Sequence, residues 1–262
     1  MRRRSTRGLL LGAVLLGFAA CGSGGSGGQA QASIPHAVTF SGEPTVGALF
    51  PPGAALHTCT ASVVASGSRN LVLTAAHCVV GTGPGLVFIP GYHRGAAPFG
   101  RFTVQRAYGL FSWLHRQSPL ADVAVLAVEP LRAGDRVVQL QDRTGANVLG
   151  RAPAPGLAVT VPAYAFGTKD DPVTCTVPVS RHQGFPTFTC TPYPDGTSGA
   201  PWLVRTGSLT SVVGVIGGLR QGGCTPQVSY SSPFGREVAA LLDRAAAGGP
   251  GDRFPQPGPS GC

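Results

Sequence analysis

The chain has 262 residues, of which 43% are hydrophobic and 12% charged, so a well-filled core is expected and disorder throughout is excluded. The formal net charge is +9, and the four arginines Arg2, Arg3, Arg4 and Arg7 at the extreme N-terminus supply four of those charges. The other basic residues form no run and are not interleaved with aromatic residues. A nucleic-acid-binding surface is therefore not expected.

The first residues predict an export signal. A basic segment, MRRRSTRG, precedes the apolar stretch LLLGAVLLGFAA, which is shorter than the roughly 20 residues that span a bilayer. Ala19 and Ala20 directly before Cys21 resemble a bacterial lipobox, in which the cysteine becomes lipidated. Ordinary secretion, with cleavage after the Ala-Gln-Ala of residues 30–32, is the alternative. We expect a signal peptide over residues 1–20, a flexible Gly/Ser-rich tether over 21–38, and an exported protein that is either a cell-surface lipoprotein or secreted.

The other cysteines agree with export. Besides Cys21 there are six, and an even number in an exported chain predicts three disulfides. No CxxC pair occurs, and the histidines are isolated from one another, so a zinc site is not expected.

From about Thr39 onward, short apolar runs rich in Val, Thr and Ile alternate with turn residues. This spacing predicts an all-β sandwich or barrel. A join near Gly145–Pro155 would divide the chain into two similar halves, over residues 39–150 and 151–246. Only Glu237–Ala246 has the pattern of a helix. The Pro/Gly-rich tail over 247–262 is expected to be extended.

Three stretches carry candidate chemistry. DGTSGAPW places Ser198 in a glycine-rich turn, NLVLTAAHCVV places His77 at the end of a strand, and PLADVAVLAV places the carboxylate of Asp122 beside an apolar strand. Each has an ordinary structural explanation: a tight turn, a core histidine beside a disulfide, or a strand cap. A nucleophile, a general base and an acid that orients the base would also need these residue types.

The three residues together favour catalysis. They follow the order His77, Asp122, Ser198, with 45 residues between the first two. An α/β-hydrolase is excluded because its order is Ser, acid, His, and because Ala200 stands where its Gly-x-Ser-x-Gly motif needs the last glycine.

From about residue 45 to 245 the chain resembles chymotrypsin-fold, trypsin-like serine proteases, and most closely their secreted bacterial trypsin-like and glutamyl-endopeptidase-like members. LTAAHC resembles the histidine motif of that family, ADVAVL its aspartate motif and GTSGAP its Gly-Asp-Ser-Gly-Gly-Pro. The resemblance implies an all-β fold of two six-stranded antiparallel β-barrels with a C-terminal helix. It also implies a peptidase that needs no cofactor.

The resemblance assigns a role to each motif. Ser198 attacks the scissile carbonyl, His77 carries the proton and Asp122 orients His77. The backbone N–H groups of Gly196 and Ser198 form the oxyanion hole. Pro192, Gly217 and Gly218 are expected to line the substrate cleft. The disulfides expected from the family and from the remaining cysteines are Cys59–Cys78, Cys175–Cys190 and Cys224–Cys262.

Two departures from the family pattern bear on activation and specificity. Thr197 stands where trypsin-like animal enzymes carry an aspartate that pairs with a new N-terminus, so no such switch is expected. Pro192 stands where pockets for Arg or Lys carry aspartate, and the wall VVGVIGG has no histidine of the glutamate-specific kind.

We therefore expect an exported serine endopeptidase, a monomer acting on proteins or peptides without nucleic acid or metal, with possible lipid anchoring at Cys21. A catalytically inactive homologue that binds through the same cleft is the main alternative. A purely structural cell-envelope lipoprotein is the other, and it leaves the three motifs unexplained.

Overall fold

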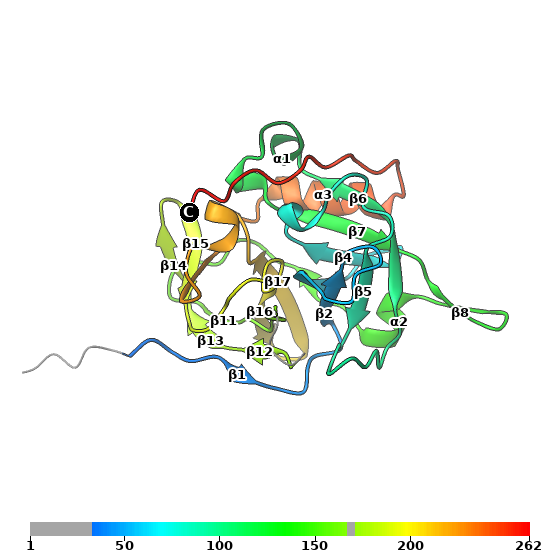
Figure 1. The fold of residues 1–262 in the computed structure, drawn as a ribbon, viewed down its shortest axis with the longest axis horizontal. Helices are drawn as coiled ribbons and strands as arrows, with labels where there is room; N and C mark the ends of the chain where they lie inside the picture. Colours follow the sequence, from blue (N-terminus) through cyan, green and yellow to red (C-terminus); the bar gives the residue numbers. More distant parts are fainter. Residues whose placement is uncertain (1–32, 167–170) are drawn as a thin grey trace, which may run out of the picture. The chain divides into compact units, whose positions relative to one another are not determined.

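The structure is a computed structural model that describes residues 33–166 and 171–262, of which Ile34–Cys262 form one unit. The predicted signal peptide and Cys21 lie outside the described residues. Strands dominate the unit, as expected for an all-β protein (Figure 1). No helix among the described residues is long and apolar enough to cross a membrane.

Six antiparallel strands close a barrel in the first half of the chain. In barrel order they are β2 Val46–Phe50, β3 Cys59–Val64, β4 Leu71–Thr74, β7 Ala124–Val128, β6 Phe102–Gly109 and β5 Val87–Pro90. All residues of β2, β3 and β4 are buried, which explains why their sequences are continuous apolar runs rather than alternating ones.

Successive residues of these strands enter two different cores. Ala48 and Phe50 pack in one cluster with residues from the second half of the chain, whereas Leu49 between them packs in a second cluster within the first barrel. The two-residue period of a strand distributes its side chains in this way. The first barrel is thus apolar on both of its faces.

The second half differs from the closed six-stranded barrel that was expected. Its strands form a five-stranded sheet and a three-stranded sheet. The five strands are β10 Val148–Leu149, β17 Leu209–Val215, β16 Pro201–Thr206, β11 Ala158–Thr160 and β13 Thr176–Pro178. The three strands are β14 Ser180–His182, β15 Phe185–Thr189 and β18 Val228–Tyr230.

The gap between the two sheets has a local cause. The Val215 N–H at the end of β17 donates to the side chain of Ser231, 3.1 Å away, instead of to a backbone carbonyl. A single backbone bond, from Gly217 N–H to the Tyr230 carbonyl, joins the two segments beyond it. A side chain has therefore replaced one rung of the ladder that would have closed the barrel.

The described end of the expected tether is not free. Val38 and Thr39 form β1, which pairs with β12 (Val173–Thr174), and the Ala37 N–H donates to the Thr191 carbonyl. The expectation of a flexible tether up to residue 38 is wrong from about residue 36 onward, because main-chain hydrogen bonds hold this segment against the second half.

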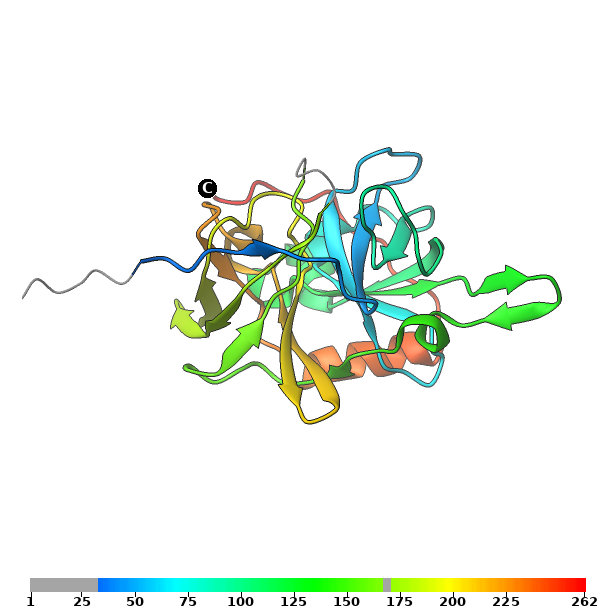
Figure 2. The same cartoon turned by 90° about the horizontal axis from the view of Figure 1, so that it is seen from below.

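Helices are few. The expected C-terminal helix is α3, Arg236–Ala246, which buries one apolar stripe, made up of Val238, Leu241, Leu242 and Ala245. The short helices α1 Phe111–Arg116 and α2 Leu140–Thr144 were not expected. A hairpin of β8 Leu131–Ala133 and β9 Arg136–Val138 extends away from the barrel (Figures 1 and 2).

The extended tail after α3 crosses back over the first barrel. Asp252 accepts a hydrogen bond from the Gly109 N–H and pairs with Arg244, and Phe254 exchanges two backbone hydrogen bonds with Gly81. We call Arg253–Cys262 the strap. In Figure 1 it runs in red along the edge of the molecule to the side of β15.

The side chain of Phe254 fastens the strap to the first barrel, since it is buried in that barrel's core cluster. Phe254→Ala is expected to lower the free energy of unfolding by about 3–5 kcal/mol, the usual loss for a buried phenylalanine. Urea denaturation measures this loss. Gln256→Ala is the control, because the exposed Gln256 side chain makes no hydrogen bond to any described residue and only its backbone carbonyl accepts one. Equal stabilities of the two variants would contradict this role of Phe254.

Candidate active site

His77 is held at the end of a barrel strand. β4 ends at Thr74, and after the fully buried Ala75 the chain turns into a short 3-10 helix, η1, Ala76–Cys78. Small side chains permit this turn against the core. The adjacent Cys78 is bonded to Cys59 at the start of β3, so the loop that carries His77 is covalently tied to the barrel.

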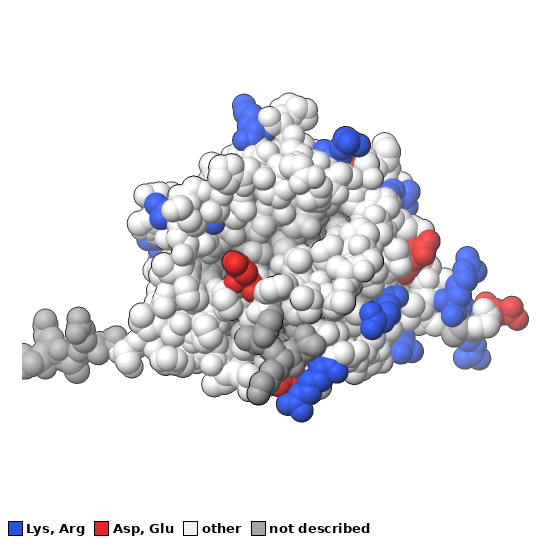
Figure 3. Space-filling model, viewed as in Figure 1, with Lys and Arg blue, Asp and Glu red and all other residues white. Residues whose placement is uncertain are grey.

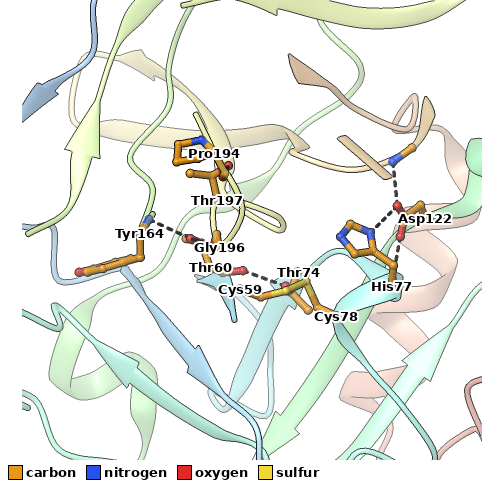
Figure 4. Close-up of a disulfide and its surroundings, with 11 residues drawn as sticks. Cys59, Thr60, Thr74, His77, Cys78, Asp122, Tyr164, Pro194, Gly196 and Thr197 are labelled. Carbon is orange, nitrogen blue, oxygen red and sulfur yellow. Dashed lines mark hydrogen bonds and ion pairs between the residues drawn. A yellow bond between two sulfur atoms is a disulfide. The ribbon is translucent and has the colours of Figure 1, made fainter. Parts of the chain in front are cut away.

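The carboxylate of Asp122 is fully buried and faces the imidazole of His77 (Figure 4). His77 Nδ1 lies 2.7 Å from Asp122 Oδ2, and the His77 backbone N–H donates to Oδ1 over 2.9 Å. A third donor, the Gly218 N–H, lies 2.8 Å from Oδ2. An ionised carboxylate only accepts hydrogen bonds, so Nδ1 is the protonated nitrogen and Nε2 is left as an acceptor.

The backbone of Asp122 is fixed separately. Its N–H donates to the Oγ of Ser232, and that hydroxyl donates to the carbonyl of Pro119 in η2 (Pro119–Ala121). Ser232 is fully buried. The side chain and the backbone N–H of Asp122 both have hydrogen-bond partners. A buried charge needs such partners if it is not to be strongly destabilising.

Ser198 lies in a loop that is bound to the first barrel through Thr60 of β3. The Thr60 N–H donates to the Ser198 carbonyl over 2.7 Å, and Thr60 Oγ1 donates to the Gly196 carbonyl over 3.1 Å. The same hydroxyl accepts a hydrogen bond from the Tyr164 N–H, so it acts both as a donor and as an acceptor (Figure 4). Thr60 has no exposed surface.

Two glycines of this loop are required by geometry. Gly196 has φ of +92°, and a Cβ there would overlap the backbone of Phe166. Gly199 has φ of +81°, and a Cβ there would overlap Thr74 Oγ1 and the Thr60 carbonyl. Only glycine permits both the left-handed backbone and the close approach of the two halves.

The N–H groups of Gly196 and Ser198 are available to a ligand. Among the residues that the structure describes, neither donates to another protein group. Backbone N–H groups are rarely left without a partner unless water or a ligand binds them. No hydrogen bond joins Ser198 Oγ to His77 within the described chain, and such bonds often shorten only when substrate is present.

His77 and Ser198 line one cleft of about 770 Å³. First-barrel residues such as Pro52, Val80 and Leu86 form one wall, and residues between Tyr193 and Pro226 form the other. The charged residues in the lining are Asp195 and Arg220. In Figure 3 an acidic side chain lies beside the hollowed centre of this face, and most of the arginines lie at its rim.

The residues expected to line the cleft are not part of this lining. Gly217 lies behind Asp122, where a Cβ would come within 3.1 Å of Oδ2, and Gly218 gives its N–H to the same carboxylate. Pro192 is exposed and follows a cis peptide bond. Direct contact of these three residues with substrate stays a prediction.

The other two expected cysteine pairs are also disulfides. Cys175 is bonded to Cys190, and Cys224 is bonded to Cys262 at the end of the strap. Cys59, His77 and Cys78 lie close enough together to suggest metal ligands. Because the two sulfurs are bonded to each other, they are not the thiolates that a metal would need.

Sequence reasoning missed two residues that support the site, Thr60 and Ser232, and it expected Gly218 in the substrate cleft rather than as a donor to Asp122. Thr60 gave a signal, since it is a polar residue next to a cysteine at the start of an otherwise apolar strand. The adjacent serines of YSSPF gave another, although Ser231 and Ser232 serve different backbone groups. A backbone donor such as Gly218 leaves no trace in the sequence.

The fold is shared with solved proteases. Protease Anisep from Arthrobacter nicotinovorans aligns with a TM-score of 0.66 and 22% identity over 80% of this chain and 98% of its own. The thermostable serine protease AL20 from an extremophilic microorganism aligns with a TM-score of 0.67 and 21% identity, over 79% and 99%. A Glu endopeptidase in complex with MPD aligns with a TM-score of 0.65 and 16% identity, over 81% and 97%.

No curated protein sequence matches the chain significantly. Residues 59–215, which include His77, Asp122 and Ser198, match the trypsin-like peptidase domain. This match spans more than half of the chain and agrees with the barrel, the cleft and the family resemblance of the three motifs. The chain belongs to the trypsin-like peptidase family.

Proposed function

We propose that the protein is an exported serine endopeptidase that cleaves peptide bonds through Ser198, His77 and Asp122. The observation that carries this proposal is the buried Asp122 carboxylate, which binds His77 Nδ1 at 2.7 Å beside a cleft that His77 and Ser198 both line. A buried acid that orients a histidine is the arrangement that makes a serine nucleophilic.

The reaction begins when Ser198 Oγ bonds to the scissile carbonyl carbon and its proton passes to His77 Nε2. The carbonyl oxygen becomes an oxyanion, which the N–H groups of Gly196 and Ser198 stabilise. His77 then gives its proton to the leaving amine as the C–N bond breaks, and an acyl-enzyme remains. Water deprotonated by His77 releases the second product and restores Ser198.

Activation by insertion of a new N-terminus is not part of this proposal. The Thr197 Oγ1 donates to the Pro194 carbonyl over 2.7 Å, and the side chain is almost fully buried. An aspartate at position 197 would need a new N-terminal amine as its partner. Thr197 instead makes a neutral hydrogen bond within its own loop. Before Val46, the segment Val38–Thr39 is paired with β12.

Export is supported by the three disulfides, since such bonds persist in oxidising compartments. The lipid on Cys21 is proposed from the sequence alone. Ordinary secretion is the alternative, and mass spectrometry of the mature N-terminus separates the two.

Labelling by a fluorophosphonate probe, which reacts only with activated serines, tests the function directly. The full chain is expected to be labelled without treatment by another protease, and Ser198→Ala is expected to remain unlabelled. Absence of labelling in folded, oxidised protein would favour the inactive homologue that binds through its cleft. Labelling that needs prior cleavage before Val46 would contradict the proposed absence of an insertion switch.

Asp122→Asn is expected to lower kcat by about 10⁴-fold. Three N–H groups donate to the two carboxylate oxygens of Asp122, and an amide keeps only one of these oxygens. Its NH₂ group would therefore either face His77 Nδ1 and favour the wrong tautomer, or face a backbone N–H. Peptide hydrolysis by the purified variants gives the rate. Asp142→Asn serves as the control, because it makes the same chemical change at an aspartate whose ion pair with Arg69 is exposed. A loss below tenfold would remove Asp122 from the proposed triad.

Thr60→Val removes a hydroxyl that fixes the Gly196 carbonyl while keeping the shape of the side chain. We expect kcat to fall by up to roughly 10²- to 10³-fold, which is the loss that removal of one oxyanion donor causes. KM should change little. Thr60→Ser keeps the hydroxyl and should restore most of kcat. Steady-state kinetics of both variants decide, and equal losses would mean that Thr60 contributes packing only.

A further inference from the structure

The strap reaches the cleft. Ser260 and Cys262 are among the residues that line it, next to Arg220, Gln221 and Cys224 of the loop that follows β17. The Cys224–Cys262 disulfide joins the strap to this loop covalently. A segment that lies about 60 residues beyond the serine motif in the sequence is therefore part of the wall of the candidate active site.

Two glutamine side chains hold the strap between its anchors. Gln117 donates to the Gln256 carbonyl and accepts the Gly258 N–H, over 3.0 and 2.6 Å. Gln221 donates to the Gly258 carbonyl over 2.7 Å. The strap backbone is thus bound on both sides where it passes from one half of the molecule to the other.

The backbone of both glutamines is unusual. Gln117 has φ of +48° and Gln221 has φ of +52°, in the left-handed region that costs free energy for residues other than glycine. Such conformations persist where surrounding contacts require them. Gln117 comes five residues before Asp122 and Gln221 three after Gly218, so the strap joins the two loops that flank the Asp122 carboxylate.

The position of the strap defines one end of the cleft. In the proposed reaction His77 protonates the leaving amine, so the leaving side of the peptide lies toward the loop of His77, Cys78 and Val80. The acyl side would then lie toward the opposite wall, and Gly196, Gly222 and Cys224 are among the residues that line the cleft. Ser260 and Cys262 stand beside that second wall.

We propose that the strap is a specificity-determining element that closes the acyl end of the cleft. Resting on the proposed peptidase function, this assigns the substrate class: peptides with few residues before the scissile bond, such as exposed N-terminal segments. Peptides with a long extension on that side meet Ser260 and the Cys224–Cys262 disulfide. Extensions after the scissile bond are not restricted by the strap.

Two variants open that end while keeping the anchors at Asp252 and Phe254. One is Cys224→Ser with Cys262→Ser. The other ends the chain at Pro255 and carries Cys224→Ser. Gln256→Ala is the matched control, because it alters a side chain of the strap and leaves the Cys224–Cys262 disulfide and the backbone hydrogen bonds in place. Thermal denaturation of each variant reports whether it is folded.

A peptide mixture first gives a sequence that the native chain cleaves. Three synthetic peptides then share it: one with two residues before the scissile bond, one extended by four more residues on that side, and one extended by four on the other. In both open variants we expect kcat/KM to rise by about tenfold or more for the peptide with the longer acyl side. One steric mismatch in a site typically lowers kcat/KM by at least this factor. The other two peptides should change little.

Labelling by the fluorophosphonate probe separates failure of this proposal from failure of the proposed function. If the native chain is labelled and the three peptides change alike or not at all, the strap does not determine specificity. If only the open variants are labelled, the strap blocks the whole cleft, and the proposal of an acyl-end boundary is overturned. If no form is labelled or cleaves a peptide, the peptidase function and this proposal fall together.

Discussion

The candidate active site depends on two consecutive residues of β3, Cys59 and Thr60. Cys59 holds the loop of His77 through a disulfide, and Thr60 holds the loop of Ser198 through its N–H and its hydroxyl. The two loops come from different halves of the chain, so a displacement between the halves would separate the proposed base from the proposed nucleophile. A rigid barrel strand that touches both loops suppresses that displacement.

The buried carboxylate of Asp122 adds a second link between the halves. Two of its three donors come from His77 in the first half, and the third is the Gly218 N–H beyond the end of β17. Removing a charge from water is strongly unfavourable unless hydrogen bonds replace the lost hydration. Formation of this site therefore favours the native arrangement of both halves together. The orientation of His77 depends, through Asp122, on Gly218, which lies 96 positions after Asp122 in the chain.

The sequence was sufficient where a feature depends on local pattern. The apolar run before His77, the apolar stripe of α3 and the three motifs each fit within a dozen residues, and the structure places the motifs around one cleft or directly behind it. The second half was less predictable, because its failure to close depends on Ser231 binding Val215, a contact between segments with no shared signal. The part of the cleft lining that the strap supplies could not be predicted for a similar reason. Glycines and prolines of the strap have no periodicity, and its path is set by side chains such as Gln117 and by the Cys224–Cys262 bond.

The path of the tail also bears on the order in which the protein is made and folds. The first barrel is synthesised early, yet Gly81 and Gly109 find their hydrogen-bond partners in Phe254 and Asp252, more than 140 residues later. Pairings over such distances in sequence are intrinsically slow to form, because the intervening chain must be ordered first. The first half therefore cannot be completed before this tail segment is present. The site in its core that Phe254 fills stays open until then.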